Sequence, residues 1–275
     1  MTTTKTEPQP QVFYPLLSLP IAEGAARAAG ALIRRNYRRL RSADSHELLE
    51  QTNQASENII ARTLRAAYPG SHVASEEGIQ LPITPQHDNL TWWLDPLDGE
   101  SNFAHGVPRF SVSVACLNNQ TNEILLGIVY DPMMDECFCA VRGNGATCNG
   151  EPIKVSRTET LTDALVASGF PIGPRTENNN TAEWSAFVPR CQGIVSMEST
   201  ALDMCYVAAG RFDMYWESDL AIWDIAAGAL IVEEAGGRLT DYSGNPVELN
   251  APVHVLATNR TLHAESIEIL ASVGH

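Results

Sequence analysis

The sequence has few basic residues for its length. Lysine and arginine together number 18, against 33 aspartates and glutamates, and the formal net charge is −15. This balance argues against a broad basic surface for nucleic acid or anionic lipid, because binding to phosphate backbones and headgroups relies on Lys and Arg. We therefore expect no nucleic-acid partner and no membrane partner. An anionic substrate would need metal ions or local basic groups to recruit it.

The sequence also lacks a cysteine framework and long apolar runs. None of its six cysteines forms a Cys-x-x-Cys pair, and several lie in apolar, strand-like stretches. Reduced, buried thiols of this kind are typical of cytosolic proteins. No apolar run reaches membrane-spanning length, and residues 1–11 are rich in Thr and Pro without an apolar signal core. We expect a cytoplasmic protein in which residues 1–11 form a disordered tail.

The sequence does have an ordinary globular composition, with 44% hydrophobic residues in a chain of 275. Apolar periodicity predicts two helices followed by three antiparallel strands, over residues 20–40, 51–68, 110–117, 124–130 and 136–141. After about residue 156, predicted strands alternate with predicted helices. We expect an N-terminal α+β domain over residues 12–155, with an antiparallel sheet and a metal-binding motif, and a C-terminal α/β domain over residues 156–275.

One stretch carries several groups that suit a metal and a phosphate: Asp95-Pro96-Leu97-Asp98-Gly99-Glu100-Ser101-Asn102-Phe103. It follows a short apolar run, which we interpret as a buried strand, and it leads into a predicted helix. Two carboxylates with the Leu97 carbonyl between them suit Mg²⁺ or a similar hard cation. Free N–H groups at the helix start would hold an anion such as phosphate. An acidic surface turn is the structural alternative.

Two further carboxylates occupy comparable positions. Glu76 ends a predicted strand over residues 72–74, and Asp224 opens a predicted helix over residues 223–235. Asp224 alone also fits a simple helix N-cap, where Asp is favoured. Together with Asp95 and Asp98, these residues give four carboxylates at strand ends or helix starts, which is enough for a two-metal site.

Two motifs in this sequence resemble the signature motifs of the inositol monophosphatase family. They are Asp95-Pro96-Leu97-Asp98-Gly99 followed by Asn102-Phe103, and Trp223-Asp224-Ile225-Ala226-Ala227-Gly228 followed by Glu234-Ala235-Gly236-Gly237. Glu76 in Ser75-Glu76-Glu77 fits a third, weaker element. The resemblance covers nearly the whole chain after the first ten or so residues. It implies a layered αβαβα sandwich of the inositol monophosphatase / fructose-1,6-bisphosphatase type and a homodimer. It also implies lithium sensitivity and Mg²⁺-dependent hydrolysis of small phosphate monoesters, with two or three Mg²⁺ ions that Mn²⁺ could replace.

By position, the resemblance implies a role for each residue of the motifs. One metal would be held by Glu76, Asp95, the Leu97 carbonyl and Asp98, and the second by Asp95, Asp98 and Asp224. Glu76 and Glu100 are the candidate catalytic residues. The expected substrate-binding positions are Leu97, Gly99, Glu100, Ser101, Glu198, Ser199, Thr200, Glu217 and Asp224. Among these, Glu217 matches a position that binds substrate hydroxyls.

Four positions depart from the family pattern. Glu100 replaces the usual threonine, whose hydroxyl helps a glutamate to position the attacking water. Asn53 replaces an acid that supports a further metal, Glu198 replaces a usual glycine, and Val195 replaces an arginine that is common in bacterial members. These changes predict an altered substrate preference and poor turnover of inositol 1-phosphate.

The sequence leaves the role of Glu100 open. It could bind another metal and offset the loss at Asn53, act as the general base, or occupy the place meant for phosphate; it could also point to solvent. Two functions follow. The first is a phosphatase with an altered substrate. The second is a family member without phosphatase activity, which acts as a binding or regulatory protein or uses its metal site for different chemistry.

Overall fold

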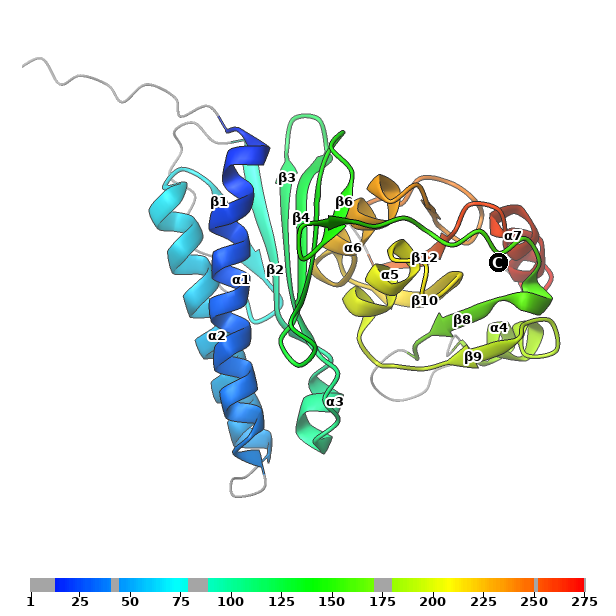
Figure 1. Ribbon diagram of the computed structural model, residues 1–275, viewed down its shortest axis with the longest axis horizontal. Coiled ribbons are helices and arrows are strands. Elements are labelled where there is room, and N and C mark those ends of the chain that lie inside the picture. The colour runs from blue at the N-terminus through cyan, green and yellow to red at the C-terminus, as the bar shows by residue number, and fades with distance from the viewer. Residues whose placement is uncertain (1–12, 41–44, 79–88, 171–179, 250–251, 275) are drawn as a thin grey trace, which may run out of the picture.

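The computed structural model describes residues 13–40, 45–78, 89–170, 180–249 and 252–274. They form five layers in the order helices, sheet, helices, sheet, helices (Figure 1). The expected layered αβαβα sandwich is therefore confirmed. The predicted tail over residues 1–11 lies outside the described residues.

Two long helices, α1 (Pro15–Tyr37) and α2 (Ser45–Ala67), form the first layer and cover the outer face of the first sheet. The buried face of α1 is made largely of alanine and glycine, so the helix lies close to the sheet. A Cβ at Gly30 would lie 2.5 Å from the ring of Tyr130. Helix α2 begins six residues before the predicted position, so Asn53 lies in its interior rather than in its first turn.

The first sheet has seven strands in sequential order. They are β1 (His72–Ser75), β2 (Leu90–Asp98), β3 (Ser111–Asn118), β4 (Glu123–Asp131), β5 (Glu136–Val141), β6 (Ala146–Cys148) and β7 (Glu151–Pro152). Only the β1–β2 pair is parallel. The alternation in β3 predicted a half-buried strand, and this was wrong: Ser111 to Leu117 are all buried, because α1 covers one face of the sheet and α6 the other.

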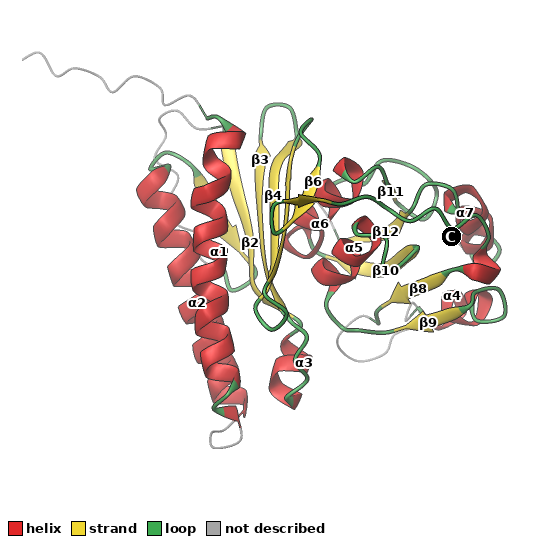
Figure 2. Cartoon of the chain, viewed as in Figure 1, coloured by secondary structure: helices red, strands yellow, loops and turns green. Residues whose placement is uncertain are grey.

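The middle layer contains α5 (Thr200–Ala208) and α6 (Ile222–Glu234), which lie between the two sheets (Figure 2). Helix α6 packs against β3 and β4 of the first sheet and against β11 of the second. The contact with β4 is close, because a Cβ at Gly127 would lie 2.7 Å from the backbone oxygen of Ala227. The expected boundary between two domains near residue 155 stays a prediction. Helix α6 packs against both sheets, so both halves of the chain share it.

The second sheet has the strand order β11-β12-β10-β8-β9. Its strands are β8 (Leu165–Ser168), β9 (Gly193–Val195), β10 (Met214–Leu220), β11 (Arg238–Thr240) and β12 (Val253–Thr258). The outer layer is formed by α4 (Thr181–Phe187) and α7 (His263–Ala271), and the 3-10 helix η2 (Leu161–Asp163) precedes β8. The short helix α3 (Glu100–His105) follows β2. Strand β10 was predicted over residues 212–216, but it continues through Glu217 to Leu220.

Helix α1 has the length and hydropathy of a membrane span, with a mean hydropathy of 1.3 over its most apolar window. The prediction that no apolar run reaches membrane-spanning length was therefore wrong as far as length and hydropathy are concerned. The helix packs against α2 and β4 through its small residues, as core helices do. The cysteines are free thiols as expected, and four of the six are buried.

The contact between Gly127 and α6 can be tested by adding one methyl group. We expect Gly127→Ala to lower the free energy of unfolding by about 1–3 kcal/mol, because the clash is with backbone that cannot rotate away. Gly24→Ala is the matched control, since no atom lies within 4 Å of a Cβ there. It should raise stability by about 0.5–1 kcal/mol through helix propensity. Urea unfolding of both variants measures this; equal effects would contradict the packing argument.

Candidate functional site

An irregularity in the β2–β3 ladder creates the centre of the site. Asp95 pairs with Ser113 and Asp98 with Ser111, so the register shifts between them and residues 96–97 bulge out of the ladder. The hydroxyl of Ser56 on α2 donates to the Pro96 carbonyl at 2.7 Å, and the Leu97 N–H donates to Asp95 Oδ1 at 3.0 Å. Bulges of this kind redirect side chains next to functional sites. Here the bulge brings two buried carboxylates to one strand end.

Glu76 and Asp224 approach this strand end from two other elements. Strand β1 runs parallel to β2 with Ser75 opposite Leu94, so Glu76 lies one step further on, beside Asp95. The first turn of α6 lies against β2 and β3 through the Trp93–Trp223 ring contact. Asp224 accepts a hydrogen bond from the Ala221 N–H at 2.7 Å. It therefore caps the start of α6 and also lies in the candidate site.

The four carboxylates share one electrostatic environment. Burial raises the pKa of Asp95 well above its ordinary value, and the charges of Glu76, Asp98 and Asp224 raise it further. Burial, followed by repulsion from Asp224 and Glu100, raises the pKa of Glu76 to about 8. Burial also raises the pKa of Asp224 to about 7. A site that holds these groups together therefore favours either bound protons or bound cations.

This donor set fits a hard divalent cation. Every group is an oxygen ligand, and the repulsion between the carboxylates is the term that a cation would remove. Among the described residues, no three or more His, Cys, Asp or Glu side chains lie close enough together to hold a metal ion as they stand. The assignment of Glu76, Asp95, the Leu97 carbonyl, Asp98 and Asp224 as metal ligands stays a prediction.

Asp98 is held in place from the middle layer. Its Oδ2 accepts hydrogen bonds from the Ser111 hydroxyl at 2.9 Å, from the Ala201 N–H at 3.2 Å and from the Ser199 hydroxyl. These bonds lower the pKa of Asp98 against the stronger effect of burial. Ser199 precedes α5 and is buried, so in this structure its hydroxyl serves Asp98.

The predicted hydroxyl-binding residue Glu217 is buried on β10. Thr200 donates to its carboxylate at 3.2 Å, and the Tyr215 hydroxyl donates to the same oxygen. Burial raises the pKa of Glu217 to about 8. A Cβ at Gly169 would clash with this carboxylate, so a larger residue there would have to displace the Glu217 side chain. Thr200 and Glu217, both expected to bind substrate, are thus in contact with each other.

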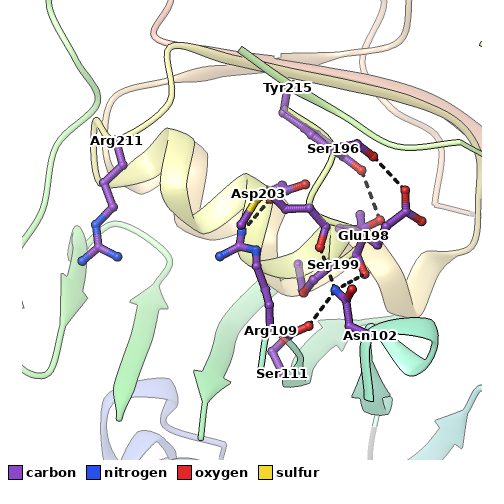
Figure 3. A network of polar contacts seen from close by, with 12 residues as sticks. Asn102, Arg109, Ser111, Ser196, Glu198, Ser199, Asp203, Arg211 and Tyr215 are labelled. Carbon is purple, nitrogen blue, oxygen red and sulfur yellow. Dashed lines mark hydrogen bonds and ion pairs between the residues drawn. The ribbon is translucent and has the colours of Figure 1, made fainter. Parts of the chain in front are cut away.

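A buried polar network connects α3 to α5 (Figure 3). Asn102 donates to the carbonyls of Arg109 and Met197, both at 2.8 Å. The Arg109 guanidinium lies 2.6 Å from Asp203 and stacks over the ring of Tyr206. The charge of Arg109 also lowers the pKa of Asp98, so this network supports the site electrostatically.

The sequence reasoning assigned no role to Asn102, Arg109, Ser111 or Asp203. Arg109 carried a usable signal, because it is an isolated basic residue directly before a buried strand in an acidic chain. Such a residue needs a buried acidic partner. Asp203 gave no signal, since it lies within an apolar helix.

The two substituted glutamates lie in different surroundings. Glu100 accepts a hydrogen bond from Asn53 and lies close enough to Glu76 to raise its pKa, so the solvent-pointing alternative is wrong. Glu198 is exposed, and its side chain accepts a bond from Ser196 at 2.7 Å (Figure 3). Its φ of 54° lies in the left-handed region, which explains why glycine suits this position.

Comparisons with known proteins agree with this geometry. The family model for the inositol monophosphatase family matches residues 18–275. The chain belongs to the inositol monophosphatase family. The structure of inositol monophosphatase from Anabaena superposes with a TM-score of 0.84 at 36% identity, over 94% of this chain and 96% of that one.

Relatives of the chain carry two kinds of name. It is 39% identical over 249 residues to the Nus factor SuhB of Pseudomonas aeruginosa, covering 88% of this chain and 91% of that protein. It is also 39% identical over 206 residues to the inositol-1-monophosphatase of Rhizobium meliloti, covering 74% and 76%. The family is one of phosphomonoesterases, but identity does not choose between these two names.

The raised pKa values predict a link between pH and metal binding. The pKa of Glu76 rises from 4.5 to about 8 and that of Asp224 from 3.8 to about 7, so the folded, metal-free protein holds protons that the unfolded chain releases. Stability in EDTA should therefore fall as pH rises from about 6.5 to 8.5. His263 titrates below this window, because burial lowers its pKa to about 4.

Thermal unfolding in EDTA and in Mg²⁺ across this window measures the link. Mg²⁺ should stabilise the protein more at pH 8.5 than at pH 6.5, because it replaces the protons that are lost. Equal stabilisation at both values would contradict the carboxylate assignment.

Proposed function

We propose that this protein hydrolyses a small phosphate monoester, such as an inositol-phosphate-like compound or a sugar phosphate, with two or three bound Mg²⁺ ions. The supporting observation is the bulge in β2, which directs Asp95 and Asp98 to the point where Glu76 and Asp224 arrive from β1 and α6. When bound by these residues, the ions would supply the activation of a water molecule and the stabilisation of the leaving oxygen. Mn²⁺ could replace Mg²⁺ at these oxygen ligands.

The protein groups around the ions have separate tasks. Glu76, beside Asp95, is placed to accept a proton from the attacking water, and Glu100 is its acidic neighbour. The N–H groups of Gly99, Glu100 and Ser101 would face the phosphoryl oxygens. Helix α3 has only six residues, so its dipole contributes little and the cations would carry most of the phosphate charge.

The alcohol part of the substrate would lie toward Glu198, Ser199, Thr200 and Glu217. The Glu217 carboxylate can accept hydrogen bonds from substrate hydroxyls, as Thr200 and Tyr215 already donate to it. Glu198 adds an exposed negative charge at this side, and Val195 supplies no compensating cation. This arrangement favours a substrate with a single phosphate and no further negative charge.

We also propose that the protein works as a homodimer, as the family resemblance implies, and that it is cytoplasmic, as its free cysteines suggest. The N-terminal part over residues 12–155 would supply most metal ligands, while the C-terminal part supplies Asp224 and the substrate segment. We propose no nucleic-acid or membrane partner, in line with the net charge of −15.

A second candidate function is supported by Glu100. Its carboxylate lies in the acidic cluster next to the predicted phosphate position and would repel a phosphate dianion. A protein with this block would act as a binding or regulatory protein, or use its ions for different chemistry. One similar protein, from Pseudomonas aeruginosa, is named a Nus factor rather than a phosphatase.

A phosphate-release screen separates the two functions. We expect Mg²⁺-dependent release from at least one monoester among sugar phosphates, inositol phosphates, nucleotide phosphates and histidinol phosphate. Release from inositol 1-phosphate should be slower, because Glu198 and Glu100 change the pocket. Metal binding without release from any of these esters would favour the regulatory function.

Removing one ligand charge tests the assignment of the site. Asp95→Asn should lower kcat by at least about 100-fold, because it removes a carboxylate that serves both ions. Glu159→Gln is the matched control, since Glu159 is an exposed carboxylate away from the site. It should leave the rate within about twofold. A comparable rate in Asp95→Asn would show that the activity arises elsewhere.

A further inference from the structure

A cavity of about 530 Å³ lies between the two sheets, at the end of α6 that is remote from Asp224. Its walls come from the start of β4, the second half of α6, strand β11 and the loop over residues 244–249. Glu233, one of its lining residues, follows Asp224 by nine residues on α6, or about 14 Å at a rise of about 1.5 Å per residue. Small-molecule sites typically have volumes of about 300–1,000 Å³. This cavity is therefore large enough for a ligand and is separate from the carboxylate cluster.

The inner wall of the cavity is apolar. Ile124 and Ala229 are buried there, and Leu239, Val247 and Leu249 are half-buried around them. These side chains belong to both sheets, to α6 and to the following loop. Removing apolar surface from water is a main source of affinity for small ligands. A ligand that fits this cavity would therefore have an apolar body.

One ion pair of the cavity is already satisfied. Arg142, which follows β5, lies 2.6 Å from Glu233, and its Nε donates to the Ile124 carbonyl at 3.1 Å. The two opposite charges of this pair offset each other. Arg142 and Glu233 therefore do not favour a ligand of either sign.

Two further charged residues line the cavity and have no ionic partner. Arg238 on β11 and Glu123 on β4 are both exposed. Within the parts of the chain that the structure describes, neither forms an ion pair, so they are also not paired with each other. Arg238 belongs to the second sheet and Glu123 to the first. The cavity thus carries a positive charge on one side and a negative charge on the other.

We propose that this cavity binds a small zwitterionic molecule with an apolar body, of the kind represented by an apolar dipeptide. Its carboxylate would pair with Arg238 and its ammonium group with Glu123, while its side chains cover the apolar wall. A dipeptide is about 7 Å long at about 3.5 Å per residue, so its two charged ends can reach two sides of one cavity.

The pair of opposite charges also selects against ligands with one charge. A simple anion would be attracted by Arg238 but repelled by Glu123, and a simple cation would meet the reverse arrangement. A neutral apolar molecule would leave both residues without a partner. The zwitterion is the class of ligand that satisfies both sides at once.

Calorimetric titration of the full chain with the dipeptide phenylalanyl-leucine tests this site. Its C-terminal amide lacks the carboxylate, and its N-acetyl form lacks the ammonium group. We expect wild type to bind the free dipeptide at least about 5-fold more tightly than either capped form, because each capped form loses one charge-assisted contact at a partly exposed position.

Two variants assign each contact to one residue. Arg238→Gln should weaken binding of the free dipeptide about 5-fold and leave binding of the amide nearly unchanged, because the amide has no carboxylate to pair. Glu123→Gln should likewise weaken binding of the free dipeptide and leave the N-acetyl form nearly unchanged. Both residues are exposed, so the variants keep the fold. Arg157→Gln and Glu159→Gln are the matched controls, since these exposed residues do not line the cavity.

Asp95→Asn should bind the dipeptide as wild type does, because Asp95 is not part of the cavity. Weaker binding in this variant would place the dipeptide at the carboxylate cluster and overturn the inference. Equal affinity of wild type for the free and capped forms would overturn it too, as would unchanged affinity in Arg238→Gln and Glu123→Gln or no binding at about 10 mM dipeptide. None of these measurements requires hydrolysis of an ester, so their outcome is independent of the proposed function.

Discussion

Repulsion between carboxylates is the constraint on which the centre of this protein depends. Asp95 and Asp98 are buried at the bulge in β2, and Glu76 and Asp224 reach the same place from β1 and α6. These groups cannot separate, because the strands are paired and α6 is packed between two sheets. Packing elsewhere in the sandwich therefore maintains an arrangement that is unfavourable without protons or cations. A charge cluster kept in this way is ready for metal ions and needs little rearrangement to bind them.

Hydrogen bonds and one ion pair around the cluster fix the position of Asp98 within it. Asp98 receives three hydrogen bonds, and Arg109, paired with Asp203, adds a positive charge behind it. Asn102 joins α3 to the segment before α5 through hydrogen bonds to the backbone carbonyls of Arg109 and Met197. This support explains why a chain with unusual residues at positions 100 and 198 can keep the carboxylates of the cluster in position.

The motifs predicted that Glu76, Asp95, Asp98 and Asp224 belong together, and their carboxylates do interact in the structure. Asp95, Leu97 and Asp98 come from one turn, and Glu76 and Asp224 begin or follow elements that apolar periodicity reveals. The burial of β3 on both faces could not be predicted, since its alternation describes one covered face and the second cover, α6, lies about a hundred residues later. The partners of Glu100 were also hidden, because Asn53 and Glu77 approach it only through α2 and β1.

The sequence by itself determined the family and the layered sandwich, because these depend on residue types at short spacing. The tertiary structure decided where each charge goes. It turned Ser199 toward Asp98, paired Arg109 with Asp203, and brought Asn53 against Glu77 and Glu100. Such contacts join residues tens of positions apart and depend on how helices and strands pack. The order of residue types along the sequence does not reveal that packing.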